Sequence, residues 1–151
     1  MGNLCRKIKR REKSNKNKKA ASILDGIPSQ MPALALAQRI QERAANVGFD
    51  WDNKNDVIKK VKEEWQEFND ACQCEDPDKI EDEFGDLLFA LVNLARFVNV
   101  NAEQALRRTI DKFNQRFRYI EQQASKKKRD LQKMTLKEMD AFWNEAKDKQ
   151  G

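Results

Sequence analysis

The chain has 151 residues, of which 39% are hydrophobic and 36% are charged, enough for one domain with a core and too apolar for a disordered chain. The sequence holds no histidine and only three cysteines, which argues against a disulfide framework, a four-ligand zinc site and the usual general base near neutral pH. No apolar run reaches the roughly 18 residues that cross a bilayer, and no secretory signal is visible. We therefore expect a cytoplasmic protein whose chemistry depends on carboxylates, Lys, Arg or a hard metal ion.

The N-terminal segment is strongly basic. Residues 1–19 hold nine Lys or Arg and one acidic residue, whereas the remainder holds 21 basic and 24 acidic residues. The net charge of +5 therefore comes from this segment. We interpret residues 1–25 as a basic tail or linker, for which weak contact with nucleic acid is one role. Residues 26–151 are expected to form one domain.

Apolar residues at helical spacing then predict three helices in succession. The first begins near residue 33 and stops at Gly48, and the second covers about 55–74, with an apolar stripe of Val57, Val61, Trp65, Phe68 and Cys72. Asp76-Pro77 is a strong start signal for the third helix, about 77–98. This helix is apolar on nearly every side, so it should be central or shared with a second subunit.

Two further helices are marked by capping boxes. Asn101 with Gln104 predicts a helix over about 102–124, and Thr135 with Glu138 predicts a short final helix. The basic loop 125–134 between them should be exposed. No alternating β-branched pattern is present, so the expected fold is all-α, a bundle of four to five helices that is dimeric or higher.

The second and third helices carry acids beside their apolar stripes. Glu64 lies on the edge of the stripe, with Glu67 one turn further along and Glu63 four residues before Glu67. Glu83 and Asp86 are spaced in the same way on the third helix. Because a short connection should make these helices antiparallel, four carboxylates converge, and such charges either raise each other's pKa values or bind a cation.

An all-oxygen set of this kind favours Mg²⁺, with Mn²⁺ as a substitute. Because Mg²⁺ commonly bridges substrate phosphates, the pattern suggests phosphate chemistry. The plainer interpretation is a solvated acidic face balanced by neighbouring lysines, which is common on helices.

Cationic and aromatic residues that could hold a nucleotide lie elsewhere in the sequence. Lys112 and Arg116 are one turn apart on the fourth helix and could hold a triphosphate. Trp143 could stack on a base or ribose, or could simply pack. Lys60 and Lys79 lie one turn before Glu64 and Glu83, where they could contact substrate or form salt bridges within their helices.

The sequence resembles a known family in the order of its motifs. EExxE at residues 63–67 is followed, after fifteen residues, by ExxD at 83–86, a pattern of the all-α nucleoside triphosphate pyrophosphohydrolases. Three longer stretches resemble the C-terminal catalytic domain of the MazG family: DGIPSQMPALALAQRIQERAANVGFDW (25–51), EFGDLLFALVNLARFVNVNAEQALRRTIDKFNQRFRYIE (83–121) and TLKEMDAFWNEAK (135–147). Typical members have two related domains, and this chain matches one.

The resemblance implies Mg²⁺-dependent hydrolysis of (d)NTPs to monophosphate and pyrophosphate by an enzyme that is at least a dimer. The metal ligands implied are Glu64, Glu67, Glu83 and Asp86. The catalytic candidates are Glu63, Glu64 and Glu67, with Glu63 either orienting water or supporting the ligands. The residues expected to contact the nucleotide are Lys112, Arg116, Trp143, Lys60 and Lys79.

Two alternatives stay open. One is a catalytically silent helical dimer that binds nucleotide or nucleic acid through its basic tail, for which salt-sensitive binding without hydrolysis would be the signature. The other is an all-α pyrophosphohydrolase of narrower specificity, acting on dUTP or a phosphoribosyl nucleotide.

Overall fold

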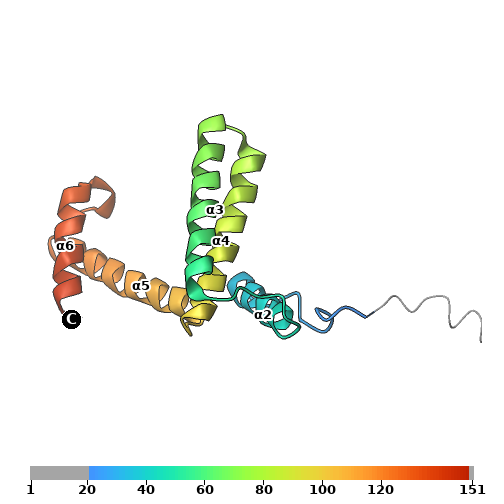
Figure 1. Cartoon of the computed structure of the whole chain (residues 1–151). Coiled ribbons are helices and arrows are strands. Elements are labelled where there is room, and N and C mark those ends of the chain that lie inside the picture. The colour runs from blue at the N-terminus through green and yellow to red at the C-terminus, as the bar shows by residue number, and fades with distance from the viewer. Residues whose placement is uncertain (1–20, 150–151) are drawn as a thin grey trace, which may run out of the picture. The chain divides into compact units, whose positions relative to one another are not determined.

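The computed structural model describes residues 21–149, so the predictions for residues 1–20 lie outside the described part (Figure 1). Over residues 21–149 the secondary structure is helical and contains no strand, which confirms the all-α class. None of the helices in this range is both long and apolar enough to span a membrane. The described part of the chain divides into two compact units with the boundary between Leu94 and Ala95, and these are described separately below.

The first unit begins with α2, Ala33–Ala45. Gly48 ends it as expected, because its φ of +89° lies in the left-handed region that suits glycine. This turn lets the Phe49 N–H donate to the Ala44 carbonyl at 3.1 Å, which satisfies one of the free carbonyls at the helix end.

An antiparallel pair of helices follows, α3 (Lys54–Cys74) and α4 (Pro77–Phe97), which lie side by side in Figure 1. The Asn53 side chain caps α3 by accepting from the Asp56 N–H at 3.1 Å, and Asp76 accepts from the N–H groups at the start of α4. Phe68 and Phe84 meet across the pair, with ring centroids 5.4 Å apart.

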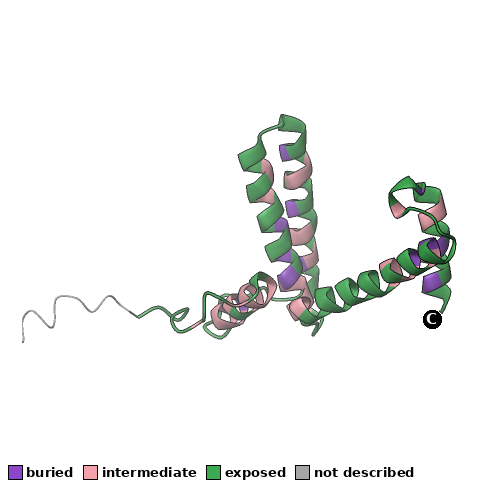
Figure 2. Ribbon diagram, turned by 180° about the vertical axis from the view of Figure 1, so that it is seen from behind, coloured by how far each residue is buried: buried purple, intermediate pink, exposed green. Residues whose placement is uncertain are grey.

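The seam between α3 and α4 follows a heptad pattern of alternating four- and three-residue steps. Its buried and half-buried positions are Val57, Val61, Glu64, Phe68 and Ala71 on α3, and Ile80, Glu83, Leu87, Ala90 and Leu94 on α4. Figure 2 shows buried positions along both helices. Two of the ten seam positions are carboxylates, so the acids lie within the packed interface of this pair.

This seam corrects two sequence predictions. Cys72 was expected to be a core residue at the helix end, but it is exposed, and Ala71 is fully buried in its place. Glu64 was expected on the edge of the apolar stripe, but it lies at the centre of the buried line, seven residues from both Val57 and Ala71. The physical reason is that the face covered by α4 is rotated by about 40° from the one inferred, at roughly 100° per residue, so that Glu64 and Ala71 replace Trp65 and Cys72 in the buried line.

The second unit contains α5 (Ala102–Lys126), the 3₁₀ turn Leu131–Lys133 and α6 (Leu136–Lys149). The Asn101 side chain caps α5 by accepting from the Gln104 N–H at 2.9 Å. The predicted capping box at α6 is present in both directions, because the Thr135 N–H donates to Glu138 at 2.8 Å and the Glu138 N–H donates to Thr135 Oγ1 at 3.2 Å.

The two helices of this unit close over a small core of Ile120, Ala124, Met134 and Phe142. The expectation of an exposed loop over 125–134 is therefore wrong for Met134, which is buried, and for Leu131, which packs against the core. A 3₁₀ turn brings these two apolar side chains back onto the helices, which a basic composition alone does not reveal.

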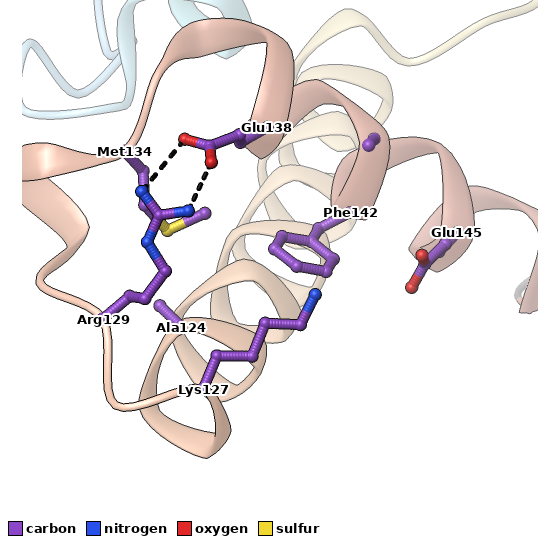
Figure 3. A pocket seen from close by; sticks show the side chains of 8 residues that line it. Ala124, Lys127, Arg129, Met134, Glu138, Phe142 and Glu145 are labelled. Atoms are coloured by element: carbon purple, nitrogen blue, oxygen red, sulfur yellow. Dashed lines mark hydrogen bonds and ion pairs between the residues drawn. The ribbon is translucent and has the colours of Figure 1, made fainter.

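A pocket of about 220 Å³ lies between the ends of α5 and α6 (Figure 3). Arg129 closes one side by pairing with Glu138, with a second contact from Nη2 to Oε2 at 3.4 Å. On the other side the Lys127 ammonium lies 4.7 Å from the Phe142 ring centroid, a cation–π contact. These contacts hold the turn between the helices.

The capping contacts predict a pH dependence of stability. The Thr135 backbone N–H, and next the Arg129 guanidinium, lower the pKa of Glu138 below its usual value of 4.5. A carboxylate with a depressed folded-state pKa stabilises the fold above its unfolded pKa, and this contribution disappears as pH falls through the folded value. Thermal melts followed by circular dichroism should give a higher melting temperature for the wild type than for Glu138→Gln at neutral pH. The difference between the two melting temperatures should narrow below about pH 4.5. A constant gap, or one matched by the exposed control Glu121→Gln, contradicts this assignment.

Candidate metal centre

The centre of the acidic cluster is Glu64 on α3. Glu64 is only 6% exposed, and its Oε2 is buried with no hydrogen-bond partner among the described residues. An ionised carboxylate oxygen buried in this way is costly unless a cation or a donor compensates it. The local sequence still buries it, because Glu64 occupies a seam position between two apolar neighbours on the same helix.

Glu83 and Asp86 reach the same point from α4. One carboxylate oxygen from each of Glu64, Glu83 and Asp86 lies within 4.8 Å of the others. For comparison, opposite oxygens in an octahedral Mg²⁺ shell are about 4.2 Å apart, from metal–oxygen distances near 2.1 Å. Small side-chain adjustments would bring the three oxygens onto one ion. The antiparallel pairing is what assembles this set from residues about twenty positions apart.

Glu67 is attached to the cluster through Glu64. A hydrogen bond with the Glu64 carboxyl raises the pKa of Glu67 above its usual value of 4.5, with further contributions from burial and from the Glu64 and Glu83 charges. Two carboxyl groups this close must share a proton or a cation. Glu67 is therefore coupled to the three-residue group, although it is itself exposed, and its role as a fourth metal ligand stays a prediction.

Lys60 lies directly against the cluster. Its ammonium is 2.6 Å from Glu64 Oε1 and 3.2 Å from Glu63 Oε1. The hydrogen bond to Glu64 is the main cause that raises the pKa of Lys60 to about 12. The salt bridge within the helix, one of the two roles considered from the sequence, is thus formed. Lys79, its predicted counterpart on α4, is exposed in the first turn of that helix.

Sequence reasoning missed one buried residue that ties α2 to α4 near the acids. Gln41 on α2 is buried, and its Nε2 donates to the Phe89 carbonyl at 2.9 Å, one turn beyond Asp86 on α4. Since a carbonyl can only accept, this bond fixes the amide orientation and leaves Oε1 buried without a hydrogen-bond partner within residues 21–149. The signal in the sequence was a single glutamine within the apolar face of α2.

Removing this link should destabilise the first unit. Gln41→Ala loses the bond to Phe89 and leaves a cavity, so we expect a loss of about 1–3 kcal/mol in unfolding free energy, measured by urea denaturation. Gln41→Leu fills the same volume without a buried polar group, so it should cost less than Gln41→Ala. Gln41→Leu as stable as the wild type would show that the hydrogen bond has no part in the effect, because both variants lose that bond and only Gln41→Ala leaves a cavity.

The second unit groups two of the predicted nucleotide contacts. The Arg116 guanidinium carbon lies 5.4 Å from the Trp143 ring centroid, and the Phe113 ring packs 5.3 Å from the same tryptophan. Lys112, one turn before Arg116, is exposed. The structure thus joins Arg116 on α5 to Trp143 on α6. The roles of these residues toward a nucleotide stay predictions.

The acids of the first unit fit a hard divalent ion. They offer only carboxylate oxygens, and the buried Oε2 of Glu64 is an acceptor that needs a positive partner. Glu63, in contrast, is exposed and paired with Lys60, so it can act only beside the cluster.

A family model covers the part of the chain that carries the acidic cluster. Residues 53–120 match the family model for the MazG nucleotide pyrophosphohydrolase domain, and this range contains every acid of the cluster. The chain therefore contains a MazG domain. The match extends from the cap of α3 to Ile120 in the last third of α5, so all four candidate metal ligands lie inside the MazG domain.

Curated relatives agree with this assignment. The chain is 43% identical over 132 residues to the nucleoside triphosphate pyrophosphohydrolase/pyrophosphatase MazG of Thermotoga maritima, covering 87% of this chain and 51% of the relative. It is 43% identical over 142 residues to the nucleoside triphosphate pyrophosphohydrolase of Escherichia coli, covering 93% of this chain and 53% of that relative. The chain spans about half the length of these two relatives. An uncharacterized Bacillus subtilis protein, YabN, is 44% identical over 138 residues, covering 91% of this chain and 28% of YabN.

Proposed function

We propose that the protein is a metal-dependent nucleoside triphosphate pyrophosphohydrolase that converts (d)NTPs to (d)NMPs and pyrophosphate. The observation that carries the proposal is the group of Glu64, Glu83 and Asp86 with its buried, unpartnered oxygen. The names of the relatives from Thermotoga maritima and Escherichia coli support the same reaction class. The intact acid set argues against the catalytically silent alternative.

Glu64, Glu67, Glu83 and Asp86 would hold the ion, with Mg²⁺ favoured by the oxygen donors and Mn²⁺ as a substitute. When bound, the ion would neutralise phosphate charge and favour deprotonation of water. Glu63 lies one residue from Glu64 and is exposed, so it is the candidate to orient the attacking water. The α3–α4 seam holds the buried ligand in place before substrate arrives, which limits reorganisation during the reaction.

Arg116, Trp143 and Lys112 are our proposed contacts for the nucleotide. The forked guanidinium suits phosphate oxygens, and the indole offers a flat surface beside it. Lys60 and Lys79 are further candidates because both lie near the acids along their own helices. We also propose a homodimer at least, because Trp65, Phe84, Phe89 and Phe113 are about half exposed in the single chain.

The test is product analysis with a panel of the eight common NTPs and dNTPs, with and without Mg²⁺. We expect pyrophosphate and monophosphate in equal amounts, and none of either after chelation. Release of inorganic phosphate alone, or turnover independent of metal, would reject the proposal. Activity confined to one nucleotide would instead favour the narrower enzyme, and salt-sensitive nucleic acid binding without hydrolysis would favour the silent binder.

A further inference from the structure

Glu64 is the seam position at which the α3–α4 pair buries a charge. A buried ionised carboxylate is costly unless a cation or a donor compensates it, and Lys60 supplies an ion pair in this structure, with Nζ 2.6 Å from Oε1. Lys60 is only one-third exposed, and it also approaches Glu63. Its ammonium is therefore held against the same cluster that would bind the divalent ion.

The two cations cannot both have their full effect on Glu64. An ion held by the cluster would place two positive charges beside the Lys60 ammonium at short range, and like charges repel strongly where water is partly excluded. Thermodynamic linkage makes this antagonism reciprocal. The ion weakens the Lys60–Glu64 pair by the same free energy by which Lys60 weakens binding of the ion.

We propose that Lys60 is a resident counter-cation of the metal-free centre, which stabilises the buried Glu64 until a divalent ion takes over that role. The ammonium then leaves Glu64 Oε1, and it becomes available to an anionic group near the ion. This inference rests on the proposed metal binding but concerns the state before substrate arrives. It assigns Lys60 a role in the metal-free state, in addition to the contact with the nucleotide proposed above.

Binding of Mn²⁺ alone, followed by electron paramagnetic resonance of the full chain, tests the inference without any turnover. Removing the competing charge in Lys60→Met should tighten Mn²⁺ binding by about tenfold. The matched control is Lys59→Met, because the neighbouring lysine pairs with the partly exposed Asp56, at 3.5 Å, and belongs to none of the proposed sites. This control should bind Mn²⁺ like the wild type.

Thermal unfolding gives a second readout that a merely structural salt bridge would not produce. Without metal, Lys60→Met should have a lower melting temperature than the wild type, because Glu64 is left buried without its ion pair. Saturating Mg²⁺ should remove most of this difference, since tighter binding to the folded state stabilises it more. Lys60→Arg, which keeps the charge, should behave like the wild type in both measurements.

A third measurement uses the wild type alone, should Lys60→Met fail to fold. The ¹⁵N-labelled Lys60 ammonium, assigned with Lys60→Arg, should give a slowly exchanging NMR signal that disappears or shifts when Mg²⁺ is added. Unchanged or weaker Mn²⁺ binding by Lys60→Met, or an ammonium signal indifferent to Mg²⁺ at saturation, overturns the inference while leaving the proposed function intact. Absence of metal binding in the wild type and in Lys60→Met overturns both.

Discussion

Glu64→Gln is expected to reduce pyrophosphate release by on the order of 10³-fold or more, the scale of losing one preorganised electrostatic group in an active site. The amide keeps the shape of the buried side chain but removes its charge, so the cluster loses its buried ligand. The measurement is steady-state pyrophosphate release at saturating Mg²⁺, together with Mn²⁺ binding in the absence of nucleotide. Both should decrease in parallel.

The matched control for this substitution lies on the same helix. Asp70 is exposed on α3 and accepts from the Gln66 side chain at 2.8 Å, away from the acidic cluster. Asp70→Asn also removes one negative charge from α3, so it should leave activity within about twofold of wild type. If Glu64→Gln retained wild-type turnover while folded, as judged by circular dichroism, the acidic cluster could not be the catalytic centre.

The second large effect is expected at Arg116. Arg116→Ala should lower kcat/KM for NTPs by on the order of 10²-fold, because the forked guanidinium is the proposed partner of the phosphates. Arg116→Lys should recover only part of this loss, since a single ammonium cannot replace two parallel N–H donors. Metal binding without nucleotide should be unchanged in both variants, which separates this site from that of Glu64.

Packing must be distinguished from substrate contact in this experiment. The Arg116 guanidinium lies over Trp143, and losing a cation–π contact costs about 0.5–1 kcal/mol of stability at an exposed site. Arg118→Ala, two residues along α5 at an exposed position, controls for the loss of positive charge. A loss of stability without any change in kcat/KM would assign Arg116 to packing alone.

Local rules were sufficient to predict most helix boundaries. Apolar spacing alone predicts the start of α3 within one residue, and the Asn53 side chain caps it there. Asp76 and Thr135 begin α4 and α6 as expected. These signals depend on hydrogen bonds between residues two or three positions apart, so the sequence around each cap contains all the information.

The prediction of an acidic cluster also came from spacing. Glu83 and Asp86 are one turn apart on α4, and a two-residue connection makes α3 antiparallel to it. Helical periodicity therefore placed Glu64 on the correct helix face, but it put the residue at the edge of that face rather than at its centre.

What the amino-acid sequence determined by itself is the set of helices, their ends and the side on which the acids lie, because these follow from contacts within a few residues of each other. The tertiary structure alone decided that α3 buries Ala71 instead of Cys72, that Gln41 ties α2 to α4 beside Asp86, and that Met134 enters the core of the second unit. A helix offers a continuous surface, and only the neighbour that packs against it selects which roughly 100° of that surface is removed from water.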